Sequence, residues 1–440
     1  MREMKNSGVA WIGNIPDSWE VKPIRHFLDE RIEKNSNQQV KAILSLSAKE
    51  GVTLYNGENH SGNKPREDLS DYKIVRKNDI VANSMNILSG SVGLSDYLGV
   101  VSPVYYVYYN RDSNVNNLYY LYYLFQCKEF QRGLWGLGNG ILVKESESGS
   151  LNTIRTRIPS KRLRMQLFPS CSKKEQDQIV IALDKNTKKI DILISNQEQQ
   201  IEKLKQYKQS LITEVVTKGL DPDVPMKDSG VEWIGMIPKH WIVKRTKFIA
   251  NALEKGKGIT KEEVISDGDI QCVRYGEIYT KYNQGFTECV SKTNLEIIQP
   301  HQFFEHGDIL FAGTGELVEE IGKNVVYLGD EKCLAGGDII VMKHHQDPAF
   351  LNYALNSIYS QKQKSYGKAK LKVVHISADN IGNVKIALPP LDEQQQIATY
   401  LDDKCAKVDR LIAIKQEKID KLNDYKKSLI YEYVTGKKEV

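Results

Sequence analysis

The feature that most constrains this chain is an internal duplication. Residues 7–22 read SGVAWIGNIPDSWEVK, and residues 229–244 read SGVEWIGMIPKHWIVK, an offset of 222 positions. A second repeat closes each half, because residues 175–217 match residues 393–435 at an offset of 218 without a gap. Between these ends the two halves resemble each other only faintly and differ in length. We therefore predict a common scaffold that presents two different globular heads.

The repeat that closes each half predicts a long helix. Apolar side chains recur there at alternating spacings of four and three residues, which is typical of a coiled coil. Neither helix has enough apolar surface to be stable alone, so we expect the two copies to pair antiparallel. The seam is interrupted at Gln197 and Lys208, and at the matching Lys415 and Lys426. These polar positions either fix the register of the pair or mark a seam that helices of another protein complete.

The length of 440 residues exceeds what one core accommodates, so we expect several domains. Each head is predicted to be an α/β (α+β) domain, with strand-like runs separated by turn residues and one clear helix. Leu351 and Tyr353 in the helix of the second head match Leu118 and Tyr120 in the first, an offset of 233. The predicted boundaries are a first head at 1–170, a helix at 171–218, a linker at 219–228, a second head at 229–388 and a helix at 389–440.

The first head contains a tyrosine-rich segment between residues 105 and 123. Exposed tyrosines can stack on the bases of single-stranded nucleic acid. We favour the other interpretation, a strand followed by a helix with the tyrosines in the core, because the second half has apolar residues at the matching helix.

Positive charge is concentrated at equivalent places in the two halves, although the net charge is only +5. Residues 361–375 contain five lysines and no acid, and residues 110–170 contain nine basic residues against four acidic ones. Both strips precede the return to the scaffold. One lysine run is usually a solvated surface, but two at equivalent places favour a surface that binds a polyanion.

Residues that could contact a nucleic acid are assigned from charge and loop position. We predict base readout from the loops at 83–86 and 313–315, through Asn86 and Thr314. Phosphate contacts are expected from eight basic side chains: Lys64, Arg66, Arg155, Arg157, Arg274, Lys368, Lys370 and Lys372.

The common catalytic motifs do not occur in the sequence. There is no GxxxxGK[ST] nucleotide loop, and the GxGxxG-like run at 313–322 has Val318 in place of its third glycine. The eight histidines and six cysteines show no metal-ligand spacing. We therefore expect no catalytic residue, no metal and no cofactor bound by this chain, and we do not expect an enzyme.

The cysteines are scattered and the N-terminal residues lack the apolar run of an export signal. These observations predict reduced thiols and a cytoplasmic protein. No stretch approaches the ~20 apolar residues that cross a bilayer, so we expect no membrane association.

Taken together, the duplicated opening, GDILFAGTG at 307–315, LPPLDEQQQIATYLDDK at 388–404 and the helix at 201–220 resemble the specificity subunit of type I restriction–modification systems. The resemblance implies two target-recognition domains that read a bipartite, asymmetric site in double-stranded DNA. It implies an antiparallel helical spacer and a subunit without catalytic activity. The resemblance also implies that residues 175–182 and 393–400 lie in the segments where modification subunits dock.

The resemblance also implies partners. Two modification subunits would bring S-adenosylmethionine for adenine methylation, and restriction subunits would use ATP and Mg. A second hypothesis is a non-catalytic coiled-coil adaptor whose heads bind proteins. One departure from the family pattern is FPSCSKKEQ at 168–176, which lacks the Pro-Pro-Leu of ALPPLDEQ at 387–394.

Overall fold

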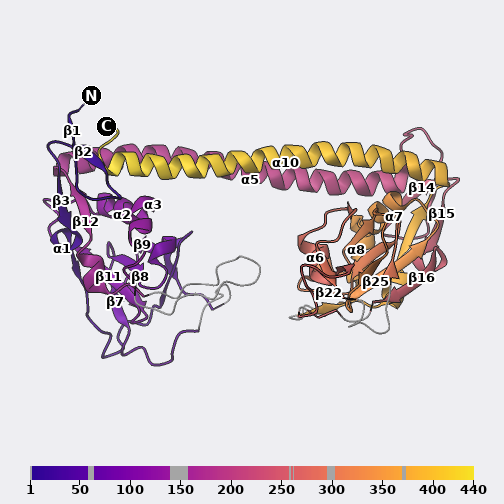
Figure 1. The fold of residues 1–440 in the computed structure, drawn as a ribbon, viewed down its shortest axis with the longest axis horizontal. Helices are drawn as coiled ribbons and strands as arrows, with labels where there is room; N and C mark the ends of the chain where they lie inside the picture. The colour runs from indigo at the N-terminus through magenta and orange to yellow at the C-terminus, as the bar shows by residue number, and fades with distance from the viewer. Residues whose placement is uncertain are drawn as a thin grey trace. The chain divides into compact units, whose positions relative to one another are not determined.

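The structure is a computed structural model, and the chain divides into two compact units (Figure 1). Unit 1 comprises Met1–Gln197 with Glu417–Val440, and unit 2 comprises Glu198–Gln416. The residues described are 2–57, 64–138, 157–256, 259–260, 262–294, 303–368 and 373–440. Two long helices, α5 (Lys173–Lys218) and α10 (Leu391–Val434), contribute to both units.

Unit 1 is built on a four-stranded sheet of order β4-β11-β8-β9, with two-stranded sheets beside it. Its strands are β1 (Met4–Asn6), β2 (Asn14–Pro16), β3 (Glu20–Pro23), β4 (Leu28–Glu30), β5 (Leu44–Ser47), β6 (Gly51–Leu54), β7 (Lys73–Val75), β8 (Ile80–Asn83), β9 (Val92–Leu94), β10 (Gly99–Val101), β11 (Tyr105–Asn110) and β12 (Leu167–Ser170). Its short helices are α1 (Ile24–Phe27), η1 (Ile87–Ser89), α2 (Leu118–Gln126), α3 (Lys128–Gly133) and α4 (Ser160–Arg164).

Unit 2 is built on a five-stranded sheet, β16-β25-β21-β23-β18, and a four-stranded sheet, β19-β17-β24-β20. Its strands are β13 (Met226–Asp228), β14 (Met236–Pro238), β15 (Ile242–Arg245), β16 (Ala250–Lys255), β17 (Ile270–Val273), β18 (Gly285–Phe286), β19 (Ser291–Thr293), β20 (Phe303–Phe304), β21 (Ile309–Ala312), β22 (Thr314–Gly315), β23 (Asn324–Tyr327), β24 (Cys333–Ala335), β25 (Ile339–His344), β26 (Val374–His375) and β27 (Lys385–Leu388). Its short helices are η2 (Thr246–Phe248), α6 (Tyr275–Thr280), η4 (Val318–Glu320), α7 (Pro348–Leu355), α8 (Ile358–Ser365) and α9 (Ala378–Gly382). The predicted class, duplicated α/β heads on an antiparallel helix pair, is confirmed.

Both long helices complete the core of each unit. In unit 1, Leu183 of α5 and Leu429 of α10 join the core that α2 and the four-stranded sheet form. In unit 2, Val215 of α5 and Leu401 of α10 occupy the corresponding places. A fully buried aliphatic side chain contributes ~1.5–3 kcal/mol. The heads are therefore packed on the helices through apolar contacts and are not attached through flexible tethers.

The sequence repeats correspond to repeated elements. The hairpin β1–β2 recurs as β13–β14 with the same register, because Met4 faces Pro16 and Met226 faces Pro238. The antiparallel pair β3–β12 recurs as β15–β27. Each pair joins the start of a head to the segment that leads into a long helix, which explains why both ends of each half are duplicated.

Helix α2 of the first head is equivalent to helix α7 of the second head at an offset of 230 positions, and not at the predicted offset of 233. Helix α2 begins after Asn117 and α7 begins after Asp347, and the side chain of each residue caps its helix. The hydroxyl of Tyr123 donates to Asp184 at 2.6 Å, and that of Tyr353 donates to Asp402 at 2.7 Å. Asp184 and Asp402 are equivalent at the offset of 218. The predicted match was wrong by about one turn. One clear helix per head was expected, whereas the described part of each head contains several short helices, including α3 directly after α2 and α8 shortly after α7.

The tyrosine-rich segment forms β11 and α2, as the core interpretation expects. Tyr106, Tyr108 and Tyr120 are buried, and the phenol of Tyr106 donates to the carbonyl of Ile158 at 2.8 Å. Tyr119 is 51% exposed at the surface of α2. Most of the segment is therefore core, and the exposed rings do not form one stacking platform along the strand.

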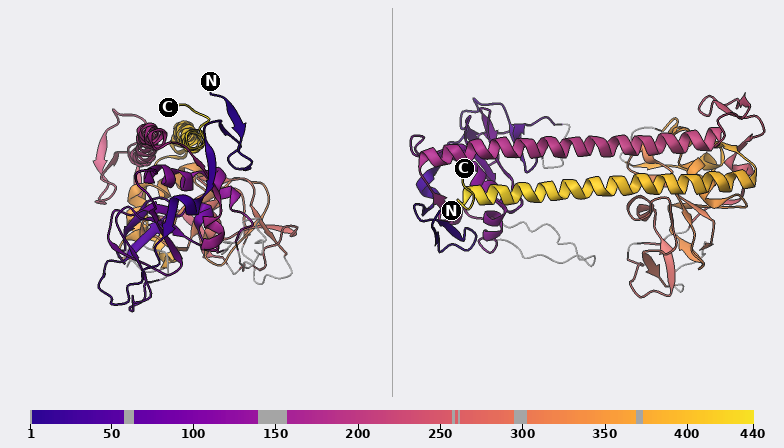
Figure 2. Two further views of the ribbon diagram at one scale, coloured as in Figure 1. Left: turned by 90° about the vertical axis from the view of Figure 1, so that its left-hand side faces the viewer. Right: turned by 90° about the horizontal axis from the view of Figure 1, so that it is seen from above.

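The two long helices run side by side and antiparallel within each unit (Figure 2). In unit 2 the ammonium of Lys208 lies 2.6 Å from a carboxylate oxygen of Asp409. In unit 1 Lys426 lies 2.6 Å from Asp191. The two ion pairs are equivalent, because Lys208 matches Lys426 and Asp191 matches Asp409 at the offset of 218. Each seam lysine thus has a partner on the opposite helix, which favours the interpretation that it fixes register.

The Lys208–Asp409 pair supplies a test of this register. Lys208→Asp places two carboxylates side by side, and we expect it to destabilise the helix pair by about 1 kcal/mol at low salt. The exchanged variant Lys208→Asp/Asp409→Lys should recover most of that loss. The measurement is denaturant unfolding at low and high salt. The same exchange at Asp191 and Lys426 is the matched control, and a different response in the two pairs would contradict the equivalence.

Candidate nucleic-acid interface

A buried glutamine at the start of each long helix positions its head. The backbone N–H of Asn117 donates to Oε1 of Gln176 at 2.7 Å, and that of Asp347 donates to Oε1 of Gln394 at 3.1 Å. Both glutamine side chains are 1% exposed. Their amide nitrogens donate to the carbonyls of Cys171 and Pro389, each at 2.9 Å. Cys171 takes the place of Pro389, so the lost prolines do not change the start of the first helix.

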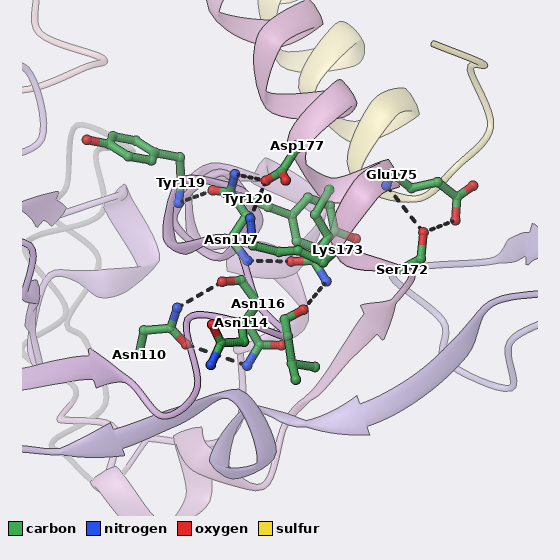
Figure 3. A network of polar contacts seen from close by, with 12 residues as sticks. Asn110, Asn114, Asn116, Asn117, Tyr119, Tyr120, Ser172, Lys173, Glu175 and Asp177 are labelled. Atoms are coloured by element: carbon green, nitrogen blue, oxygen red, sulfur yellow. Dashed lines mark hydrogen bonds and ion pairs between the residues drawn. The ribbon is translucent and has the colours of Figure 1, made fainter.

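The same region of unit 1 carries a wider polar network (Figure 3). The amide of Asn117 donates to Asp177 at 2.6 Å, and Lys173 contacts the same carboxylate at 2.6 Å. Ser172 accepts a hydrogen bond from the backbone N–H of Glu175 at 3.3 Å, which caps the first turn of α5. These contacts fix the N-terminus of α2 on the first turns of α5.

The second repeated tryptophan, Trp19 in unit 1 and Trp241 in unit 2, bonds to the glutamate that precedes the buried glutamine. The indole N–H of Trp19 donates to Glu175 at 3.4 Å, and that of Trp241 donates to Glu393 at 3.0 Å. Both indoles are buried, and a buried indole N–H normally requires an acceptor. The Glu-Gln pair at the start of each helix therefore fixes two parts of the head: the repeated opening through Glu, and the head helix through Gln.

Removal of one glutamine tests this arrangement. Gln394→Ala leaves the N–H of Asp347 buried without an acceptor, and we expect a loss of about 1–3 kcal/mol in the stability of unit 2. Gln396→Ala, at an exposed position on the same turn, should change stability by less than about 0.5 kcal/mol. Thermal unfolding measures both. Equal effects of the two variants would show that the contact does not fix the head.

The strand that leads into each predicted readout loop starts at an equivalent turn. The carboxylates of Asp79 and Asp308 accept backbone N–H groups three residues earlier, from Arg76 at 2.8 Å and Glu305 at 2.9 Å. The preceding residues, Asn78 and Gly307, have φ of 69° and 87°. Glycine and asparagine tolerate this left-handed conformation best. The aspartate and this turn therefore set the direction of β8 and β21.

Each strand ends beside a basic strip: the contact is to Ile158 within the strip at 110–170 in unit 1, and to Ile376 directly after the strip at 361–375 in unit 2. In unit 1 the N–H of Ile158 donates to the carbonyl of Ser84 at 3.1 Å. In unit 2 the N–H of Ile376 donates to the carbonyl of Gly313 at 2.9 Å. The predicted readout loop and the end of the predicted phosphate-binding strip are thus brought together in both units. In unit 1 this places Arg157, which is exposed, next to the loop that contains exposed Asn86.

In unit 2 the juxtaposition is a short two-stranded sheet. Thr314 of β22 pairs with His375 of β26, and Oγ1 of Thr314 lies 3.1 Å from Nδ1 of His375. The ammonium of Lys368 donates to the carbonyl of His375 at 2.8 Å and to Asn380 at 3.2 Å. Thr314 itself is only 6% exposed. His375, which is exposed, was not predicted as a site residue, although its place before Ile376 matches that of Arg157 before Ile158.

Arg274 reaches the same end of unit 2 through a turn. The N–H of Gly336 donates to the carbonyl of Val273 at 2.8 Å, and the N–H of Gly313 donates to the backbone carbonyl of Asp338 at 2.7 Å. Residues 336–338 therefore link the end of β17 to the loop at 313–315. The guanidinium of Arg274 also lies 3.6 Å from Glu277, which compensates part of its charge.

The remaining predicted phosphate contacts are placed differently. Lys64 and Arg66 are exposed on the segment before β7, and the backbone N–H of Arg66 donates to the phenol of Tyr72 at 3.2 Å. That segment belongs to the β10-β7 part of the head and not to the loop at 83–86. Arg155, Lys370 and Lys372 lie outside the described residues. Their role stays a prediction.

One lysine of the basic strip has a structural role. Lys364 is 1% exposed, and its ammonium donates to the carbonyls of Gly322 at 2.7 Å and Leu355 at 2.9 Å. It also donates to the side chain of Asn324 at 3.3 Å. The interpretation of all five lysines as one polyanion surface was therefore wrong for Lys364, because it joins α8 to the centre of the head.

Burial of Lys364 predicts a pH dependence. Burial lowers the pKa of Lys364 from 10.5 to about 7. Between these values the unfolded chain binds more protons than the folded chain, so this group makes the stability of unit 2 rise with pH from about 7 to about 10. Lys364→Met should lose that rise while losing stability overall, because three acceptors are left unpaired.

Denaturant unfolding at several pH values measures this difference. Lys362→Met, which changes an exposed lysine of the same helix, is the control and should keep the wild-type dependence. If the free energy of unfolding rose equally with pH in wild type and in Lys364→Met, the low pKa assigned to Lys364 would be contradicted.

Several observations limit the chemistry of the described residues. Among them, no group of three or more His, Cys, Asp or Glu side chains is arranged to bind a metal ion. Burial raises the pKa of Cys127 and of Cys171 to about 12, so these thiols are protonated and poor nucleophiles at neutral pH. Along the described part of the chain, no helix combines the length and apolarity that a bilayer span requires.

Comparisons with known proteins agree on one family. The family model described as "Type I restriction modification DNA specificity domain" matches residues 238–424. The putative type I restriction enzyme MjaX specificity subunit of Methanocaldococcus jannaschii is 30% identical over 219 residues, which is 46% of this chain and 47% of that protein. The type I restriction enzyme MjaVIII specificity subunit of the same organism is 28% identical over 269 residues, 60% of each chain. The match thus spans roughly half the length of these curated relatives.

A solved structure shows the same fold. A chain from "Structural basis underlying complex assembly and conformational transition of the type I R-M system" aligns with a TM-score of 0.67 and 13% identity, covering 96% of this chain and 98% of that chain. The fold is a duplicated one, in which two long helices carry two different α/β heads. Residues 238–424 therefore match a type I restriction modification DNA specificity domain, and the curated relatives that resemble this chain are type I restriction enzyme specificity subunits.

Proposed function

We propose that this chain is the DNA sequence-specificity subunit of a type I restriction–modification complex. It binds a bipartite, asymmetric site in double-stranded DNA, and each head reads one half-site. The chain directs adenine methylation or cleavage by partner subunits in the cytoplasm and has no catalytic activity of its own. The observation that carries this proposal is the duplicated juxtaposition of a loop and a basic segment: Ser84 with Ile158 in unit 1, and Gly313 with Ile376 in unit 2.

The two juxtapositions support recognition of different sequences. The backbone contact is the same in both units, whereas the loop residues differ, with Met85 and Asn86 in one unit and Thr314 and Gly315 in the other. Side chains that reach base edges specify sequence, and basic side chains beside them position the duplex through phosphates. A common frame with different loop residues is what an asymmetric bipartite site requires.

The long helices support two equivalent partners. Six exposed residues outside the contacts described above are identical in the two copies of the helix repeat. Unit 1 presents Gln178, Lys189, Leu193, Lys421, Tyr425 and Ser428, and unit 2 presents Gln396, Lys407, Leu411, Lys203, Tyr207 and Ser210. On one helix, at about 3.6 residues per turn, these positions share one face. Each unit therefore offers the same surface, which suits one modification subunit per unit.

Exposed apolar groups are central to this repeated surface. Leu193 and Leu411 are 44% and 48% exposed, and Tyr425 and Tyr207 are each 54% exposed. We assign S-adenosylmethionine, ATP and Mg to the modification and restriction partners, as the resemblance to type I specificity subunits implies. The chain itself is proposed to bind no cofactor.

Single substitutions test the number of partners. Leu193→Asp should remove one of two modification subunits and Leu411→Asp the other, because a buried, unpaired carboxylate opposes docking. The double variant should bind neither. Native mass spectrometry of the reconstituted complex gives the stoichiometry. Ile192→Asp is the matched control, because Ile192 is 52% exposed on the same helix but is not repeated. Retention of both partners by Leu193→Asp would exclude this surface.

A methylation map tests the proposed function itself. Adenine methylation is mapped across the host genome with and without the gene. Loss of one bipartite motif on deletion is the expected result, and exchange of the two heads between relatives then assigns each half-site. An unchanged methylome, in cells shown to express the protein, would favour the alternative of a coiled-coil adaptor whose heads bind proteins.

A further inference from the structure

One edge of unit 2 carries basic side chains that the proposed readout site does not use. Strand β15 supplies Lys244 and Arg245, η2 supplies Lys247, and β27 supplies Lys385, which faces Arg245 across the strand pair. Lys244, Arg245 and Lys247 are exposed. We name these four residues, together with Lys368, the basic edge.

The basic edge is continuous with the readout end of the head. Lys368 contacts both His375 of β26 and Asn380 of α9. At the other end of α9, a Cβ on Gly382 would lie 3.2 Å from Cβ of Lys247. The backbone N–H of Thr246 donates to the carbonyl of Val384 at 2.8 Å, which fixes η2 beside the start of β27. A path of cations thus runs from β26 over α9 to β15.

The charges of the basic edge are not compensated by ion pairs. Within the described residues, none of its five cations has a carboxylate oxygen within 4.0 Å. Lys368 instead contacts a carbonyl and an amide, and the ammonium of Lys247 lies 5.4 Å from the ring centre of Phe248. That ring is 69% exposed. Asp379 is the acid that α9 contributes to this region.

Unit 1 provides an internal comparison at the offset of 222. Lys22 matches Lys244, but its ammonium lies 2.9 Å from Glu20, whereas Ile242 stands at the glutamate's position in unit 2. Pro23 stands where unit 2 has Arg245. Arg25 matches Lys247, and within the described residues neither has a carboxylate oxygen within 4.0 Å, so the two heads differ at Lys244 and Arg245. A lysine-rich solvated surface that served only solubility would not require this difference between equivalent strands.

We propose that the basic edge of unit 2 binds the phosphates of duplex DNA that flanks the recognised site. Unit 2 therefore has a longer footprint than unit 1, and the additional contacts are independent of sequence. This inference rests on the proposed function, because the duplex must first be placed at β22 and β26 by the half-site. Phosphate contacts by exposed lysine and arginine release counterions, so they appear as a steeper salt dependence of binding.

The experiment compares duplexes with different flanks. The chain, assembled with its modification subunits, is titrated with duplexes that carry the motif from the methylation map. One duplex has long DNA flanks on both sides of the motif. In each of the other two duplexes, one of the flanks ends at the edge of the motif. We expect wild type to lose affinity and salt dependence when one particular flank is cut and to change little when the other is cut. Lys244→Gln/Lys247→Gln should lower the salt slope on the long duplex by about two, at ~0.9 per phosphate contact, and should be insensitive to that cut.

Lys22→Gln/Arg25→Gln is the matched control, because it removes the same charge at the equivalent positions of unit 1. Equal salt slopes for the two double variants, or equal sensitivity of wild type to both cuts, would overturn the inference. An unchanged slope in Lys244→Gln/Lys247→Gln would also overturn it and would leave an acidic protein partner as the occupant to test. Failure of wild type to bind the motif on any duplex would instead overturn the proposed function.

Discussion

The arrangement of each head depends on one buried amide at the start of a long helix. Gln176 and Gln394 each accept a backbone N–H from the head and donate to the chain just before the helix. An unpaired polar group at either place would cost free energy, because both sites are closed to water. The contact therefore restricts where the head helix begins relative to the scaffold. The position of the readout loop is restricted in the same way, because the strand that leads into the loop packs against the same core.

The duplicated frame was predictable because its signals are local or repeated. Seam positions follow the helical period, and the Glu-Gln pair recurs at a constant offset, so a sequence comparison is sufficient to find them. The heads were less predictable. A helix rich in tyrosine and leucine gives a similar sequence pattern when its alignment is shifted by about one turn. This similarity explains why Tyr353 was aligned with Tyr120 and not with Tyr123. The capping residue Asn117 and the hydrogen bond from Tyr123 to Asp184 distinguish the two alignments.

The contacts of the candidate residues with DNA stay predictions, whereas the structure shows where these residues lie. Asn86, Arg157, Thr314 and Lys368 were chosen from loop position and charge, and the structure brings the members of each pair to one end of its head. Lys364 was misassigned because its acceptors lie on β23, on the turn before it and on α7, and no short pattern reveals a tertiary contact of that kind. Lysine burial also runs against the usual distribution of charged residues. The fold therefore divides one basic strip into a structural part and a surface part.

The pairing of α5 and α10 also imposes an order on biosynthesis. Leu429, Ile430, Tyr433 and Val434 belong to the core of unit 1, and the phenol of Tyr120 donates to the carbonyl of Val434 at 3.0 Å. These residues are translated after all of unit 2. The first head emerges from the ribosome early, with an apolar surface that stays open until the second head has been made. A nascent chain of this design requires either slow collapse of the first head or protection by a chaperone during elongation.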